Sequence, residues 1–262
     1  MTQAHESKPA FSIGNDYFTP DIKRMISDAI DTVDRHEFGS ETQPSDPTVQ
    51  IMTWDRLQSI LSPEQMQIIR QCKGVDIRQY GFRGAAIQAI DPPEDGFVRI
   101  EPQSYKAQVT TKKDDVETIK VVEAKTPVQF VPKTPYDAFC ELNRAMREAI
   151  GKQVIIVSGY RSPAYQMMVF LTFLHDEYDY DFKKTAAHAA LPGYSQHGSY
   201  DSTALDIGSV DILPIPDDPV SFEQTIEFQW MQQHAKHFNF QLSYPRDNTS
   251  GVMYEPWHWQ YI

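Results

Sequence analysis

The spacing of apolar and polar positions predicts helices and strands in irregular alternation. Apolar residues recur every three or four positions after Thr19-Pro20, an N-cap followed by an N1 proline, so we expect a helix over residues 20–34. Residues 36–49 are polar and rich in glycine and proline, which is typical of a loop or linker. Ser62-Pro63-Glu64 repeats the helix-start signal ahead of another apolar face.

The middle of the chain, residues 74–131, has a different pattern. Short fragments rich in β-branched residues, FVRIEP and ETIKVVEA, alternate with the turn sequences PPEDG and KKDD. This region is therefore predicted to form hairpins.

The part after residue 132 is predicted to form helices and strands in turn. A helix begins at Thr134-Pro135, and Ser221 with Gln224 forms the capping box of a later helix that ends near residue 237. The remaining predicted elements are a helix over 164–174 and strands at 153–158, 203–208, 240–244 and in the terminal VMYEPWHWQYI. Because the order lacks a strict βαβ rhythm, we predict an α+β fold with a small antiparallel sheet flanked by helices and an N-terminal mixed helix and hairpin extension.

Composition and charge narrow the possible functions. Hydrophobic residues make up 40% and charged residues 23% of the 262 positions, which is typical of a folded globular chain. The net charge of -12 repels a phosphate backbone, so nucleic acid is not an expected partner. The two cysteines, Cys72 and Cys140, have no CxxC spacing and predict neither a zinc knuckle nor a disulfide framework.

No targeting or membrane segment is visible in the sequence. The first thirty residues lack the basic start and apolar run of a secretory signal. No apolar stretch approaches the roughly 18 residues that a membrane helix requires.

The sharpest chemical feature is Glu255-Pro256-Trp257-His258, close to the last residue of the sequence. Proline argues against a helix here, and in a regular strand Glu255 and His258 would lie on opposite faces. We therefore expect a turn or bulge at Pro256 that brings the two side chains to one site.

The chain can supply the residues of a zinc peptidase site. Such a site needs about three protein ligands, a position open for water, and a carboxylate that takes the proton of that water. His197, Asp206 and His258 form a possible ligand set, with Glu255 as the base. A mixed nitrogen and oxygen set suits zinc better than calcium or magnesium.

Spacing alone leaves a plainer interpretation open, because a histidine among aromatic residues is more often a packed side chain with one hydrogen bond. That interpretation is kept for His5, His36, His175, His188, His234 and His237. The acidic stretch at residues 176–181 is interpreted as a solvated surface and not as a second metal site.

Four motifs in order carry a resemblance to a known family: SGYRS followed by Gln166, then PGYSQH, ALDIG and MYEPWHW. The chain resembles the VanY-type D-alanyl-D-alanine carboxypeptidases and their zinc D,D-peptidase relatives over residues 126–262. Residues 1–125 carry no such resemblance. We therefore divide the chain into an N-terminal region of unknown role, 1–125, and a catalytic domain, 126–262.

The resemblance implies roles for the matching positions. His197, Asp206 and His258 would bind one zinc ion, and Glu255 would be the catalytic base. Arg161 would act at the substrate site, holding the peptide or the charge that develops on the scissile carbonyl. The positions that would line the substrate cleft are Ser158, Gln166 and Ser195.

One departure from the family pattern concerns the ligand loop. The family usually reads SxHxxGxAxD, whereas SQHGSYDSTALD makes the loop from His197 to Asp206 two residues longer and places Ser202 where glycine is expected. Because loops absorb such insertions at small entropic cost, we expect the metal site to be kept. Weaker zinc binding is the alternative.

The resemblance predicts removal of the terminal D-alanine from peptidoglycan stem peptides. Two alternatives remain: a lysin-like peptidoglycan endopeptidase, and a non-hydrolytic cell-wall-binding protein with the same fold. The substrate implies the periplasm or cell envelope, although no export signal is visible. The oligomeric state is not predicted.

Overall fold

The computed structural model describes residues 12–39, 46–88, 91–113, 116–212 and 219–262. The chain forms two compact units, and each is built from three separate segments. The first unit contains residues 1–91, 162–195 and 249–252, and the second contains 92–161, 196–248 and 253–262.

The first unit is helical. Its α-helices are α1 (Pro20–Phe38), α2 (Trp54–Ile60), α3 (Pro63–Lys73), α5 (Pro163–Thr172) and α6 (Phe182–His188). Short 3-10 turns cover Asn15–Tyr17, Pro47–Ile51 and Ile77–Tyr80, and a π-helical turn, Phe173–Glu177, continues α5. The apolar faces of these helices pack into one core that includes Ile26, Leu57, Ile69, Phe170 and Leu171.

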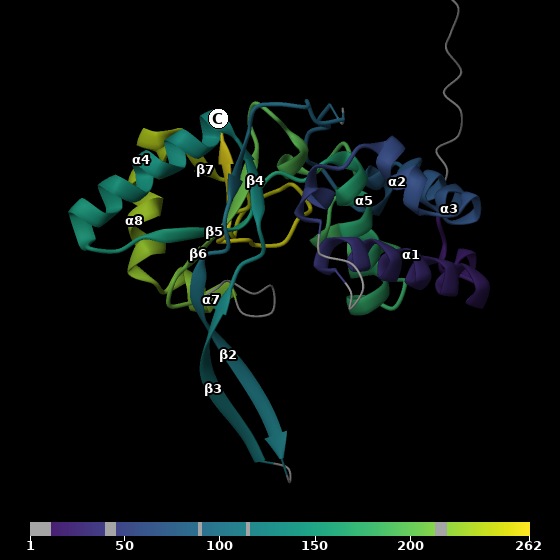
Figure 1. The fold of residues 1–262 in the computed structure, drawn as a ribbon, viewed down its shortest axis with the longest axis horizontal. Coiled ribbons are helices and arrows are strands. Elements are labelled where there is room, and N and C mark those ends of the chain that lie inside the picture. The colour runs from purple at the N-terminus through teal and green to yellow at the C-terminus, as the bar shows by residue number, and fades with distance from the viewer. Residues whose placement is uncertain (1–11, 40–45, 89–90, 114–115, 213–218) are drawn as a thin grey trace, which may run out of the picture. The chain divides into compact units, whose positions relative to one another are not determined.

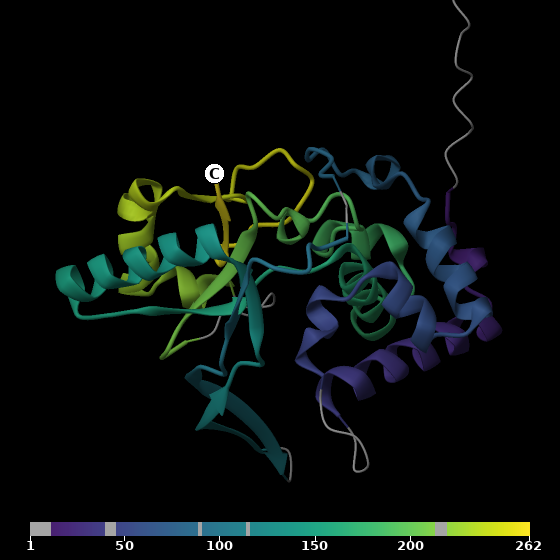
Figure 2. The same ribbon diagram turned by 45° about the horizontal axis from the view of Figure 1, so that its top comes forward.

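The second unit is built on a four-stranded antiparallel sheet with the order β5-β6-β8-β7. The strands are β5 (Val154–Ser158), β6 (Ala204–Ser209), β7 (Phe240–Leu242) and β8 (His258–Tyr261). Three helices accompany them: α4 (Lys133–Ile150), α7 (Pro219–Glu223) and α8 (Ile226–His234). Figures 1 and 2 both show α4 and α8 together on one side of this sheet.

The core of the second unit lies between these helices and the sheet. Leu142 and Met146 of α4 and Phe228 of α8 are buried against Ile207 and Trp259. Because side chains alternate along a strand, the neighbours of these core residues on β6 and β8 face away from the helices. That outer face carries the candidate site.

The middle of the chain adds two smaller strand pairs to the second unit. β1 (Phe97–Ile100) pairs with β4 (Gln129–Pro132), and between them β2 (Ser104–Lys113) and β3 (Val116–Lys125) form a long hairpin. In Figure 1 this hairpin extends away from the four-stranded sheet. Its base is tied to the sheet where the Lys106 amide donates to the Val210 carbonyl at 2.9 Å.

The predicted α+β class with a small antiparallel sheet is confirmed. The predicted division at residue 125 does not coincide with the two units. Residues 92–125 belong with the sheet because β1 pairs with β4. Residues 162–195 belong with the N-terminal helices because α5 and α6 share their apolar core.

Several predicted element ends are wrong. α4 begins at Lys133 without a side-chain cap, not at a Thr134 cap. Ser221 lies inside α7, and the following helix, α8, is separately capped by Thr225, whose hydroxyl accepts from the Phe228 amide. Part of the predicted 36–49 loop is helical, since α1 reaches Phe38 and a 3-10 turn begins at Pro47; residues 40–45 lie outside the described ones.

Candidate metal and catalytic site

Two of the three predicted ligands are neighbours across the sheet. Asp206 on β6 lies directly opposite His258 on β8. Both alternate with core residues, so both project from the outer face of the sheet. The Asp206 Oδ1 atom lies 3.1 Å from His258 Nδ1.

The third predicted ligand, His197, lies in the 3-10 turn Gln196–Gly198 and is 1% exposed. Its Nδ1 lies 2.7 Å from the Gly159 carbonyl oxygen. Because a carbonyl can only accept, Nδ1 carries the proton and Nε2 keeps its lone pair. Nε2 lies 3.3 Å from Asp206 Oδ1 and, among the described residues, is a buried nitrogen without a hydrogen-bond partner.

One ligand atom from each of His197, Asp206 and His258 lies within 4.8 Å of the others. In the part of the chain that the structure describes, no other group of three His, Cys, Asp or Glu residues converges in this way. The two imidazoles and one carboxylate, with an unpartnered buried nitrogen, fit a zinc ion. In the acidic stretch at residues 176–181, Asp176, Glu177 and Asp179 are exposed.

The long ligand loop is closed by its own hydrogen bonds. The hydroxyls of Ser199 and Ser202 lie 2.7 Å apart, and the Thr203 hydroxyl donates to the His197 carbonyl at 3.2 Å. Gln260 on β8 donates to the Ser202 carbonyl. The two extra residues therefore form a tied loop and leave the three ligand groups together.

A turn places Glu255 beside the ligands. The His258 amide donates to the Glu255 carbonyl at 3.2 Å, so Pro256 and Trp257 occupy the centre of a β-turn immediately before β8. The Glu255 Oε2 atom lies 3.5 Å from His258 Nδ1. The predicted turn at Pro256 is confirmed, whereas the predicted strand over the whole terminal segment is shortened to β8.

Arg161 contacts two of the ligands. Its backbone amide donates to the His197 carbonyl at 3.1 Å, and its Nη2 lies 3.5 Å from Asp206 Oδ2. Ser158 lies opposite Asp206 in the β5–β6 register, next to a bulge in β5. These contacts bring two of the predicted substrate-binding residues to the ligand cluster.

The other two predicted substrate-binding residues, Gln166 and Ser195, belong to the first unit. Both are buried. The Gln166 amide nitrogen donates to the Ala190 carbonyl at 2.8 Å, and its Oε1 has no partner among the described residues. Their substrate-binding role stays a prediction.

Burial sets the electrostatics of the site. Burial, assisted by Arg161, lowers the pKa of His197 to about 4, so this imidazole is neutral at pH 7 and its lone pair is available. Burial also raises the pKa of Asp206, but His197 and His258 outweigh this effect and hold that pKa well below its usual value. Burial and the Asp206 carboxylate raise the pKa of Glu255 well above its usual value, which suits a general base.

Three further residues at the site had no role in the sequence analysis. Gly159 supplies the carbonyl that orients His197, Gln196 places its Oε1 3.0 Å from His258 Nε2, and the Tyr244 ring lies 4.9 Å from the His258 ring. Gly159 and Gln196 lie inside the SGYRS and PGYSQH motifs, which is the sequence signal that could have found them.

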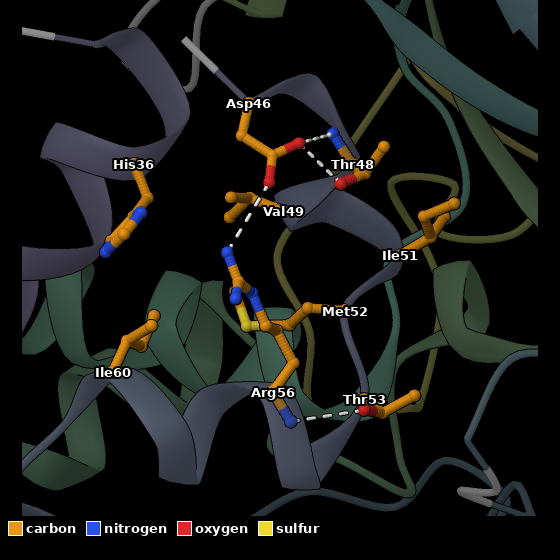
Figure 3. A pocket seen from close by; sticks show the side chains of 9 residues that line it. All are labelled: His36, Asp46, Thr48, Val49, Ile51, Met52, Thr53, Arg56 and Ile60. Atoms are coloured by element: carbon orange, nitrogen blue, oxygen red, sulfur yellow. Dashed lines mark hydrogen bonds and ion pairs between the residues drawn. The ribbon is translucent and has the colours of Figure 1, made fainter. Parts of the chain in front are cut away.

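A separate pocket lies in the first unit (Figure 3). Its volume is about 360 Å³, and its lining includes His36, Asp46 and Arg56. The Asp46 carboxylate accepts a hydrogen bond from the Thr48 amide and forms an ion pair with Arg56 at 3.8 Å. The plainer interpretation of His36, as a packed side chain, stays a prediction.

Comparison with known proteins identifies the family. The family model described as "VanY: D-alanyl-D-alanine carboxypeptidase" matches residues 129–262. A D-alanyl-D-alanine carboxypeptidase of Enterococcus faecium is 34% identical over 137 residues, which cover 51% of this chain and 38% of that protein. The putative carboxypeptidase YodJ of Bacillus subtilis (strain 168) is 29% identical over 144 residues, which cover 53% and 49%.

The matched segments thus span less than half the length of these two curated relatives. Among solved structures, that of the LdcB LD-carboxypeptidase superposes with a TM-score of 0.47 and 23% identity, covering 70% of this chain and 75% of that one. The family match covers just over half of the chain and contains the three predicted ligands, Arg161 and Glu255. The chain belongs to the VanY family of D-alanyl-D-alanine carboxypeptidases.

Proposed function

We propose that this chain is a zinc-dependent D,D-carboxypeptidase that removes the terminal D-alanine from peptidoglycan stem peptides. The observation that carries the proposal is the convergence of His197, Asp206 and His258 within 4.8 Å, with the Glu255 carboxylate 3.5 Å from His258 Nδ1. Membership of the VanY family supports the choice of bond.

His197, Asp206 and His258 would hold one zinc ion. When bound, zinc supplies a Lewis acid for the scissile carbonyl and lowers the pKa of a water molecule towards neutrality. His197 is kept in the tautomer that leaves Nε2 free by its hydrogen bond to Gly159. Asp206 is held between the two imidazoles and Arg161.

Glu255 acts as the general base and then as the general acid. Its carboxylate takes the proton of the attacking water and delivers it to the amine that leaves as D-alanine. The raised pKa of Glu255 strengthens it as a base. Its backbone is fixed by the hydrogen bond that its amide donates to the Tyr244 carbonyl and by the turn to His258.

Arg161 supplies positive charge at the reacting centre. Its guanidinium is permanently charged, and its buried Nε has no partner among the described residues. This donor suits the carboxylate of the substrate or the oxyanion that develops on the carbonyl. Ser158, Gln166 and Ser195 are proposed as further substrate-binding residues.

Product analysis separates this proposal from its alternatives. The zinc-loaded chain is incubated with a muropeptide that carries a pentapeptide stem and with a cross-linked muropeptide dimer, and the products are weighed by mass spectrometry. We expect the pentapeptide to lose one alanine. Cleavage of the cross-link without alanine release would indicate an endopeptidase, and intact substrates bound to the protein would indicate a wall-binding role.

A further inference from the structure

Gln196 precedes one ligand in sequence but contacts the other in space. It lies next to His197 in the 3-10 turn, yet its Oε1 is 3.0 Å from Nε2 of His258, 62 positions along the chain. The tied ligand loop that follows holds this turn against β8, where Gln260 bonds to Ser202.

Gln196 contacts the His258 ring at the nitrogen opposite the one that faces the predicted metal site. Nδ1 of His258 faces Asp206 and Glu255, at 3.1 and 3.5 Å. A neutral imidazole that offers the lone pair of Nδ1 must carry its proton on Nε2, and that proton needs an acceptor in a buried site. The Gln196 oxygen is such an acceptor.

The other neighbours of the ring do not provide this acceptor. The Tyr244 ring packs against His258 at a centroid distance of 4.9 Å and an angle of 42°, and the His197 ring lies at 4.8 Å and 79°. These rings restrict where the imidazole lies. Only Gln196, among the described residues that hydrogen-bond to His258, faces Nε2.

We propose that Gln196 is a positioning residue for the metal: its side-chain oxygen accepts the Nε2 proton of His258 and so fixes the ring and tautomer that present Nδ1 to zinc. The inference rests on the proposed zinc site and adds a residue outside the ligand set. Partners of this kind, which orient a ligand histidine, change metal affinity by about 10- to 100-fold when removed.

The test measures zinc affinity of the full chain by competition with a chromogenic chelator. Gln196→Leu keeps the size of the side chain but removes the acceptor, and we expect the Kd for zinc to rise about 10- to 100-fold. Gln196→Glu keeps an acceptor and adds charge, so it should bind zinc at least as tightly as the unchanged chain. Gln229→Leu, at an exposed position of α8, is the matched control and should leave the Kd unchanged.

Thermal unfolding of the metal-free variants separates positioning from general damage, because positioning alone moves the Kd and leaves the metal-free melting temperature in place. Equal zinc affinity in Gln196→Leu and the unchanged chain would overturn the inference. If Gln196→Leu does not fold, a folded Gln196→Glu protein with a Kd more than tenfold weaker would overturn it as well. Failure of the unchanged chain to bind zinc would instead reject the proposed function.

Discussion

The carboxyl groups of the buried Glu255 and of Asp206 lie close together but have different charged neighbours. Asp206 is flanked by two imidazoles, which hold its pKa low. The pKa of Glu255 is raised by burial and by the negative charge of Asp206. The two carboxyl groups therefore have pKa values shifted in opposite directions by their neighbours. These pKa directions support the proposed roles of Asp206 in metal binding and of Glu255 in proton transfer.

Glu255→Gln tests that division of roles. The amide keeps the size of the side chain but cannot take a proton, so we expect the variant to bind zinc and to release D-alanine about 100- to 10,000-fold more slowly. Zinc content by atomic absorption and turnover of a pentapeptide substrate are the two measurements. Turnover within threefold of the unchanged chain would show that another group is the base.

At the level of single residues, the sequence predicts the candidate ligands and base better than the groups that orient them. His197, Asp206, His258 and Glu255 match a zinc peptidase in residue type and order, and the structure brings these four side chains together. Gln196 lies inside a motif, but its contact with His258, like that of Tyr244, depends on how β7, β8 and the ligand loop pack. Such packing is not encoded in the spacing of any motif.

The end of β5 is the element that fixes the first ligand. Gly159 follows the strand, accepts the His197 proton, and lies so close to β4 that an added Cβ would be 2.5 Å from the Phe130 carbonyl oxygen. The backbone of Gly159 is also held in place because its amide donates to the Oε1 atom of the buried Gln129 side chain at 2.9 Å. The position therefore requires glycine for close approach.

Gly159→Ala should force β4 and β5 apart. We expect a loss of about 1–3 kcal/mol in the free energy of unfolding from overpacking, together with weaker zinc binding because the Gly159 carbonyl moves. Denaturant unfolding and zinc titration measure the two effects. Gly198→Ala is the control, since its added Cβ would meet its nearest neighbour at 3.5 Å; equal behaviour of the two variants would contradict this explanation.

The starts of helices could be predicted where a capping residue next to the helix determines them. The Thr19 cap of α1 and the Ser62 capping box of α3 are both present. The Thr134 cap failed because the chain passes from β4 directly into α4, and the Ser221 capping box failed because Thr225 provides a separate start for α8. The pairing of β1 with β4 around the β2–β3 hairpin was not predictable, since it joins segments about thirty residues apart.

On the scale of the whole molecule, the two units interleave along the chain. The segment between β5 and the ligand loop, residues 162–195, contributes α5 and α6 to the first unit, while its two ends continue into the second. In α5, Met167, Phe170 and Leu171 are fully buried in a core shared with α1–α3. Motif order in the sequence does not reveal this arrangement.

A chain that begins at residue 126 tests whether the matched segment folds without the N-terminal helices. It keeps every predicted ligand but loses α1–α3 and β1, so the apolar face of α5 and one edge of β4 are uncovered. We expect aggregation or a molten state, measured by size-exclusion chromatography and dye binding. Shortening the tip of the β2–β3 hairpin, which forms a two-stranded sheet of its own, should leave a folded protein. A stable, cooperative 126–262 fragment would contradict the two-unit description.

In the described residues, no helix is both long enough and apolar enough to cross a membrane. The second unit alone contains His197, Asp206, His258, Glu255 and Arg161. The predicted metal ligands and the predicted base therefore all belong to the second unit.

Zinc reconstitution tests whether His197, Asp206 and His258 bind the one zinc ion on which activity depends. The full chain is stripped with a chelator and titrated with zinc while release of D-alanine from a pentapeptide is followed. We expect no release without metal, a linear rise as zinc is added, and a plateau at one zinc per chain, which Asp206→Ala should fail to reach. Release that persists after chelation, or a plateau that Asp206→Ala reaches at the same stoichiometry, would contradict it.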